Sequence, residues 1–325
     1  MIKFFRQSYA IQYVVIALLA IALWIPAFMS GKMTTGLNEP VTPLYNLIVG
    51  LLDFAPVAQL IFAFLLLVLE TLLFNAILVD NQIIGKVSTM GAFVFVLLMS
   101  LTPMQTNCYP FALSVVFILL LIQVLFDFYF SQNPEMSLLR AGVYVALASM
   151  CYFPAVLLIV WVLIALPIAK KGSVRLELIP VTGFLFTYFL YFAGVFLFGD
   201  FLSVMAGYRD YFSALRLTIE GFDLKSIILL LFLLLSSLVL YWNNSGFEKT
   251  IAIRVKMTVI VLLLVFSLPM LFLGGNVLMN GLVFLALAII FSYELSNLGT
   301  TGWTDIMLVL FLLLVFANHY YFKLL

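Results

Sequence analysis

The sequence has 325 residues, of which 66% are hydrophobic and 9% are charged, and its formal net charge is +1. A soluble domain of this length is about half apolar and about a quarter charged, so it could not bury this much apolar surface. Soluble enzymes, secreted disulfide scaffolds and nucleic-acid binders are therefore excluded. The two cysteines, Cys108 and Cys151, and the single histidine, His319, form no metal-binding pattern. We expect an all-α polytopic membrane protein without a metal site or a cofactor.

The apolar runs predict the membrane spans. A helical span needs about 20 mostly apolar residues, and continuous rather than alternating apolar runs argue against a membrane β-barrel. Lys3 and Arg6 precede the first run, which has no small-residue cleavage site, so we expect an uncleaved span and a cytoplasmic N-terminus. Two runs are short, and we expect neighbouring protein to shield them or flanking residues to extend them. The full spans expected are Tyr9–Met29, Pro56–Val79, Lys86–Leu101, Phe111–Phe130, Leu178–Phe198, Ser226–Trp242, Met257–Leu273, Val277–Tyr293 and Thr304–Phe316.

The segment 141–168 has two interpretations, one long span or two short helices that form a hairpin. Proline removes a backbone donor and disfavours helix in the residue before it, so the break would fall between Tyr152 and Pro154. The hairpin places ten of the 15 basic residues on the cytoplasmic side, whereas the single span places seven there. The positive-inside rule favours the hairpin. We therefore expect Arg140 and Lys170 on the cytoplasmic side, a periplasmic C-terminus and about 11 membrane helices in one transmembrane domain.

The first long external segment, residues 30–55, contains two carboxylates. Glu39 and Asp53 lie on either side of a short apolar stretch, residues 44–52, which is too short to span and is expected to lie along or dip into the interface. A carboxylate held just above the bilayer is suited to act as a general base for an acceptor hydroxyl. A solvated loop acid would give the same pattern.

The second long external segment, residues 199–225, has apolar residues near helical spacing. Arg209 and Arg216 are seven residues apart, so they fall near one face of a helix. A surface-lying amphipathic helix is one interpretation. The other is a pair of arginines that bind a lipid-linked phosphate through charge-assisted hydrogen bonds.

Glu70 is the acidic residue deepest inside an expected span, in the run LLLVLETLLFNAIL, and Asn75 follows five residues later. An ionised carboxylate at this depth would cost several kcal/mol unless it were paired or hydrated. Glu70 is therefore either a protonated or hydrogen-bonded structural residue between helices, or a proton or cation site that lines a cavity.

Two stretches resemble the GT-C membrane glycosyltransferases. The run NEPVTPLYNLIVGLL is similar to their first external loop, in which an acidic residue precedes a Pro-Leu-Tyr-Tyr-like sequence; here Glu39 matches the acid and Pro43, Leu44 and Tyr45 match the sequence. The stretch LLRAGVYVALASMCYFPAVLLIVWVLIALPIAKK is similar to their central segment. The paired-acid motif of these loops is absent, which leaves Glu39 alone or with Asp53. The whole chain resembles a family of bacterial polytopic inner-membrane proteins with the GT-C layout.

The resemblance implies a transferase that uses a polyprenyl-phosphate-linked sugar, with Glu39 as catalytic base and Arg209 and Arg216 as phosphate ligands. A second hypothesis is a non-enzymatic subunit of a cell-envelope complex that contacts other membrane proteins through small residues of the hairpin. A third is a proton-linked transporter or flippase that uses Glu70. The small residues meant in the second hypothesis are Ala141, Gly142, Ala146 and Ala148.

Overall fold

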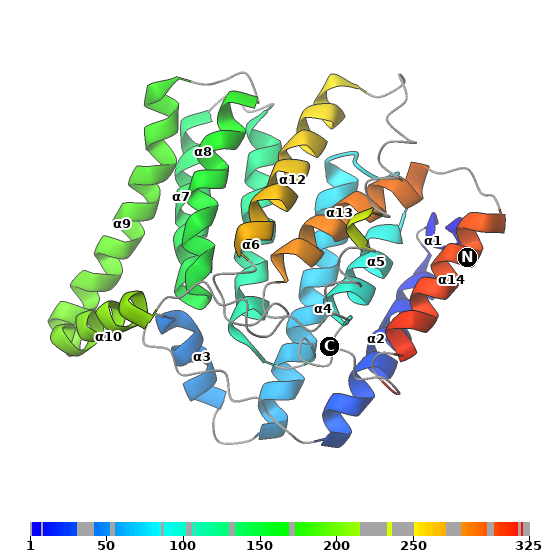
Figure 1. The fold of residues 1–325 in the computed structure, drawn as a ribbon, viewed down its shortest axis with the longest axis horizontal. Helices are drawn as coiled ribbons and strands as arrows, with labels where there is room; N and C mark the ends of the chain where they lie inside the picture. Colours follow the sequence, from blue (N-terminus) through cyan, green and yellow to red (C-terminus); the bar gives the residue numbers. More distant parts are fainter. Residues whose placement is uncertain are drawn as a thin grey trace.

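The structure is a computed structural model. The residues it describes are 2–7, 9–30, 42–52, 56–85, 88–101, 106, 108–129, 134–168, 173–214, 233–235, 250–270, 281–297, 302–317 and 320. Every regular element in these residues is a helix and none is a strand, so the predicted all-α fold class is confirmed for the described part of the chain (Figure 1).

Among the described residues, five helices are long and apolar enough to cross a membrane. Four of them lie within a few residues of the predicted spans, because a continuous apolar run of about 20 residues leaves little choice of position. The fifth begins at Ile251, well before the predicted start at Met257. The chain is therefore a membrane protein by composition and helix length. The five are α2 (Ala10–Ser30), α4 (Pro56–Asp80), α6 (Pro110–Phe128), α9 (Val174–Phe198) and α12 (Ile251–Met270).

Two further predicted spans are short helices in the middle of the protein. Helix α5 (Met90–Met99) replaces the predicted span 86–101, and all ten of its residues are buried. Helix α13 (Leu282–Asn297) replaces the predicted span 277–293 and is buried along most of its length. Both are surrounded by other helices, so neither has to match the thickness of the bilayer. Of the two shortest predicted runs, 86–101 is thus shielded as expected, whereas 304–316 forms α14 (Gly302–Ala317), on which Val309 and Leu313 are exposed.

Helix α14 and Tyr320 contact the first two helices of the chain. The backbone N–H of Ile2, in α1 (Ile2–Phe5), donates to Asp305 Oδ1 over 2.9 Å, and Asp305 lies in the first turn of α14 (Gly302–Ala317). The hydroxyl of Tyr320 donates to the carbonyl of Ala22 in α2 over 2.6 Å. Helix α14 therefore runs beside α2 (Figure 1). The predicted span 226–242 lies outside the described residues except for 233–235.

The segment 141–168 is broken where the proline predicts it. Helix α7 (Pro134–Cys151) ends before Tyr152, whose backbone is extended at φ −138° and ψ 103°. A short 3-10 helix, η1 (Phe153–Leu157), and helix α8 (Leu158–Ile168) follow. Pro154 lies in the first turn of η1, where its missing backbone N–H breaks no helical hydrogen bond, whereas inside a continuous helix it would break one.

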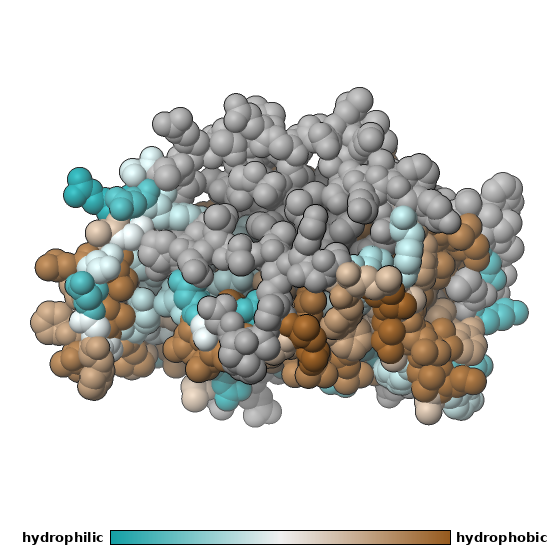
Figure 2. Space-filling view, turned by 90° about the horizontal axis from the view of Figure 1, so that it is seen from below, coloured by the Kyte–Doolittle hydropathy of each residue, from teal (hydrophilic) through white to brown (hydrophobic). Residues whose placement is uncertain are grey.

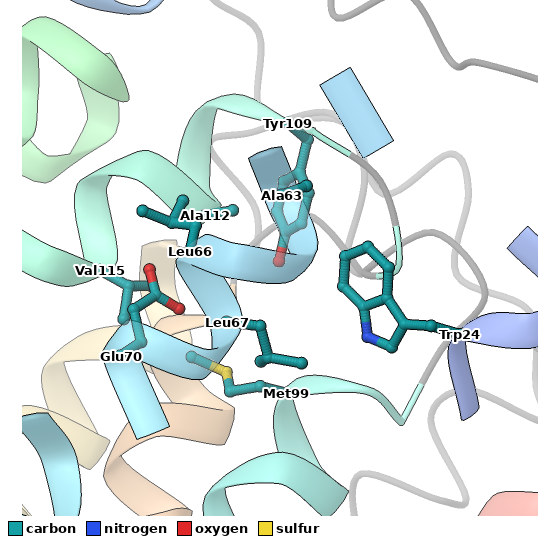
Figure 3. A pocket seen from close by; sticks show the side chains of 9 residues that line it. All are labelled: Trp24, Ala63, Leu66, Leu67, Glu70, Met99, Tyr109, Ala112 and Val115. Carbon is teal, nitrogen blue, oxygen red and sulfur yellow. The ribbon is translucent and has the colours of Figure 1, made fainter. Parts of the chain in front are cut away.

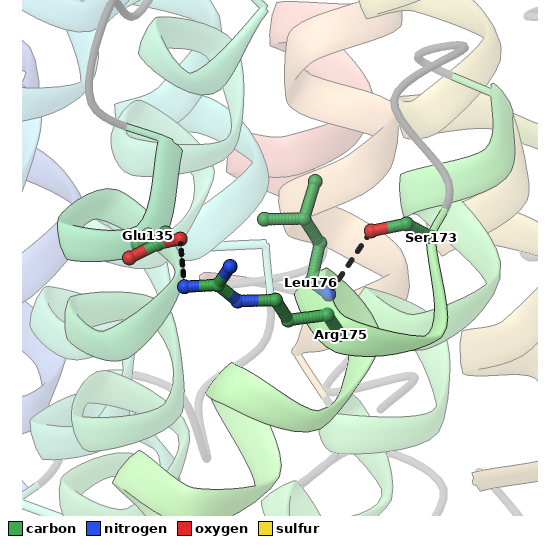
Figure 4. A network of polar contacts seen from close by, with 4 residues as sticks. All are labelled: Glu135, Ser173, Arg175 and Leu176. Atoms are coloured by element: carbon green, nitrogen blue, oxygen red, sulfur yellow. Dashed lines mark hydrogen bonds and ion pairs between the residues drawn. The ribbon is translucent and has the colours of Figure 1, made fainter.

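Contacts at one end of the bundle show that α8 returns beside α7. Arg175 and Glu135 form an ion pair with 3.0 Å between Nη2 and Oε1, so α7 and α9 begin at the same end (Figure 4). At that end Leu166 of α8 packs in one buried cluster with Phe128 of α6 and Leu138 of α7. We call this the basic end, since Arg140, Arg175 and Lys256 also lie there.

The opposite end of the bundle carries two short helices. Helix α3 (Pro43–Leu52) packs against α7 and α4, and α10 (Phe201–Ala214) follows the end of α9 (Figure 1). Tyr45 of α3 shares a buried cluster with Leu113, in the first turn of α6, and Cys151, the last residue of α7. We call this the α3 end. The described parts of both predicted external segments therefore lie at one end.

The small residues of α7 are used inside the protein, which corrects their expected role as a surface for other membrane proteins. Ala141, Ala146 and Ala148 are fully buried. A Cβ atom at Gly142 would overlap the backbone carbonyl of Pro180, and one at Gly183 would lie 2.5 Å from the carbonyl oxygen of Leu139. The glycines allow α7 and α9 to pack with their backbones in contact, as small residues do in membrane helices. This leaves the small residues of α7 no exposed surface for a partner.

Candidate functional site

The α3 end is built around a buried tyrosine. The hydroxyl of Tyr45 donates to the backbone carbonyl of Cys108 over 3.0 Å, and its ring is 1% exposed. Cys108 lies in the turn that leads into α6, so this bond ties α3 to the start of that helix. Burial raises the pKa of the Cys108 thiol to about 11, because the charged thiolate is disfavoured away from water. Helix α3 is therefore fixed against the bundle.

Aromatic side chains join the hairpin break to α10. Phe153 of η1 makes edge-on contacts with Tyr208, Tyr211 and Phe212 at ring-centroid distances of 5.9, 5.1 and 5.4 Å. Edge-to-face pairs of this kind add to the stabilisation from burial. Arg209 is exposed on the same helix. The structure thus brings the hairpin break and the first half of the second external segment together.

The sequence-predicted site residues are placed in part. Arg209 lies on α10, as the predicted amphipathic helix requires. Glu39, Asp53 and Arg216 lie outside the described residues, so their roles stay predictions. Glu70 lies in the middle of α4, away from α10, and belongs to a different site.

The apolar surface continues from this end along α9, where few residues are buried. Seen from the α3 end, hydrophobic side chains reach the edge of the molecule that α9 and α10 form (Figure 2). Leu185, Phe186, Phe189 and Phe196 are among the large exposed side chains of α9. An apolar face of this extent on a membrane protein is suited to contact with lipid chains.

The interior of the bundle holds a small cavity beside Glu70, with a volume of about 20 Å³. A cavity of that size has room for about one water molecule. Figure 3 shows the carboxyl group of Glu70 and the hydroxyl of Tyr109 directed into it. The lining residues come from α2, α4, α5, α6 and the turn before α6; they are Trp24, Ala63, Leu66, Leu67, Glu70, Met99, Tyr109, Ala112 and Val115.

Glu70 and Asn75 do not form a pair. Glu70 is 3% exposed, and its Oε1 has no hydrogen-bond partner among the described residues. Asn75 instead accepts a hydrogen bond from the backbone N–H of Ala92 over 3.2 Å and donates to the carbonyl of Ser88 over 3.2 Å. It therefore caps the first turn of α5. Five residues along a helix turn a side chain to a different face, which separates the two groups.

Two contributors were missed from the sequence. Tyr109 lies directly before Pro110, which marks a helix start and places Tyr109 beside the bundle interior. Lys256 is 6% exposed, and its Nζ donates to Asn81 Oδ1 over 2.8 Å. It also lies 5.5 Å from the centre of the Phe126 ring. Lys256 anchors the start of α12 to the ends of α4 and α6.

The described residues contain no group of three or more His, Cys, Asp or Glu side chains that could hold a metal ion. Comparison of the chain with protein-family models, curated proteins and solved structures gave no significant match. Two places among the described residues could therefore bind a ligand or a proton. One is the α3 end, with its exposed arginine and apolar flank, and the other is the buried carboxyl of Glu70.

Proposed function

We propose that the protein is an integral inner-membrane transferase of the GT-C type that uses a polyprenyl-phosphate-linked sugar at its α3 end. The supporting observation is that α3, the hairpin break and α10 meet at one end of the bundle. A substrate of this kind has a polar head at the membrane surface and a long apolar tail. The α3 end offers an exposed cation, Arg209, beside the apolar face of α9.

The proposal places the basic end in the cytoplasm and the α3 end in the periplasm. The positive-inside rule supports this orientation. It gives a cytoplasmic N-terminus, a periplasmic C-terminus and about nine full spans plus the hairpin. Of the described basic residues, Arg209 lies at the α3 end, and the others lie at the basic end or in and beside the N-terminal helix α1: Lys3, Arg6, Arg140, Arg175, Arg254 and Lys256.

The proposed roles follow the chemistry of the side chains. Glu39 takes the proton of the acceptor hydroxyl as general base. Arg209 and Arg216 hold the phosphate that leaves with the lipid, and they stabilise the charge that develops on it. Asp53, one residue beyond α3 in the sequence, assists in substrate binding. The lipid tail lies along the apolar face of α9.

Transfer of a labelled sugar by the purified protein tests this proposal. Glu39→Gln is expected to abolish transfer, whereas Glu177→Gln, a carboxylate at the basic end, is expected to leave it unchanged. Equal activity of wild type and Glu39→Gln would remove Glu39 from the mechanism.

Binding of polyprenyl phosphate separates the substrate proposal from the catalytic one. Arg209→Ala is expected to weaken binding about tenfold or more, because a charge-assisted hydrogen bond contributes about 1.5–3 kcal/mol. Arg140→Ala, which removes an exposed arginine at the opposite end, is the matched control. Equal affinities of the two variants would exclude Arg209 from the lipid site.

A further inference from the structure

We propose that Glu70 is a reversible proton-binding site inside the membrane, with water in the adjacent cavity as the partner of its carboxyl group and Tyr109 as the neighbouring hydroxyl. The site lies apart from the α3 end and does not depend on transferase activity.

The carboxyl group of Glu70 lacks the partners that an ionised form needs. Its Oε1 is fully buried and has no hydrogen-bond partner among the described residues. No described basic residue contributes to the cavity lining. An unpaired carboxylate in such surroundings costs several kcal/mol relative to water, so the neutral acid is the favoured resting form.

The cavity offers hydrogen-bond partners for the neutral carboxyl group of Glu70. It lies against the unpartnered carboxyl group and has room for about one water molecule, at about 20 Å³. Tyr109 is the other titratable residue in the described lining, and its hydroxyl can donate or accept a hydrogen bond. The remaining lining is apolar apart from the indole nitrogen of Trp24, which lies 3.4 Å from Ser100 Oγ as a hydrogen-bond donor.

The residues that line the cavity favour binding of a proton over binding of a metal cation. Sodium and larger cations need several oxygen ligands, whereas the side chains of the lining provide oxygen only from Glu70 and Tyr109. A proton needs a single carboxylate oxygen, and a water molecule beside it provides the route for exchange. Loss of the proton would place a charge between α4 and α6, where the two helices pack. Proton binding would therefore alter the contact between these helices.

Infrared spectroscopy of the purified protein in lipid vesicles tests the proposal through the carbonyl stretch of a protonated carboxylic acid. Wild type is expected to show this band at neutral pH, lose it reversibly at alkaline pH, and shift it on transfer to D2O. Glu70→Gln is expected to lose the part of the band that Glu70 contributes, while the buried carboxyl of Glu294 can contribute the remainder. Glu135→Gln, which changes an exposed carboxylate at the basic end, is expected to leave the band unchanged. An unchanged band in Glu70→Gln would overturn the proposal.

Tyr109→Phe provides a second reading that leaves the carboxyl group in place. Removing the hydroxyl changes the hydrogen bonding of the cavity water, so the carbonyl band is expected to remain and to shift in frequency. A band identical to that of wild type would exclude Tyr109 from the site. A band that fails to shift in D2O would show that the carboxyl group does not exchange with water, which also overturns the proposal.

Discussion

Replacing Gly142 with alanine tests the packing that defines the hairpin. A Cβ atom at this position would overlap the carbonyl oxygen of Pro180, a backbone atom that cannot rotate away. Forcing an extra carbon into a packed site costs about 1–3 kcal/mol. Gly194→Ala is the matched control, because it lies in α9 with no atom within 4 Å of its added Cβ. Both changes gain about 1 kcal/mol of helix propensity, so this contribution cancels in the comparison.

Thermal unfolding of the two variants in the same detergent provides the assay. Gly142→Ala is expected to be less stable than Gly194→Ala by about 1–3 kcal/mol, a fall in apparent Tm of about 1–2 °C per kcal/mol for a chain of 325 residues. Because α7 and α9 carry the hairpin and α10, Gly142→Ala is also expected to weaken any activity at the α3 end. Equal melting temperatures would refute the backbone contact between α7 and α9.

Two further predictions concern the attachment of α3. Tyr45→Phe removes the hydrogen bond to the Cys108 carbonyl and is expected to destabilise the protein by about 1–3 kcal/mol; Tyr9→Phe, with a side chain that is 62% exposed, is expected to have no effect on the melting temperature. With its pKa raised from 9.0 to about 11, the Cys108 thiol holds about a hundredfold less reactive thiolate at pH 8 than an unperturbed thiol would. Its labelling rate is expected to rise about tenfold per pH unit until pH 11, and labelling at an unperturbed rate would contradict its burial.

The long helices could be predicted from the sequence because their signal is local. A continuous apolar run long enough to cross a bilayer fixes α2, α4 and α6 within about two residues. The break before Pro154 could also be predicted, since proline acts on its own neighbours. The predicted span 86–101 was longer than α5, and the predicted span 277–293 stopped before α13 ends at Asn297. Burial by neighbouring helices removes the length requirement, and this burial is a property of the tertiary fold.

The site was harder to predict because it depends on tertiary contacts, which the local sequence does not show. Asn75 and Glu70 are close in sequence, but only the fold shows that Asn75 caps α5. The small residues of α7 indicated close helix packing. Their spacing did not show whether the packing partner was another helix of the same chain, such as α9, or a helix of another protein. The burial of Lys256 could not be predicted, because its partners, Asn81 and Phe126, are far away in the sequence.

The most direct test of the account is the membrane side of three single cysteines in a variant without Cys108 and Cys151. Met136→Cys and Ser173→Cys place thiols at exposed positions of the basic end, and Ser213→Cys places one on α10. In intact cells an impermeant thiol reagent is expected to label position 213, and to label positions 136 and 173 only after the membrane is opened. Labelling of 136 and 173 from opposite sides, or protection of 213, would contradict the hairpin and the external α3 end.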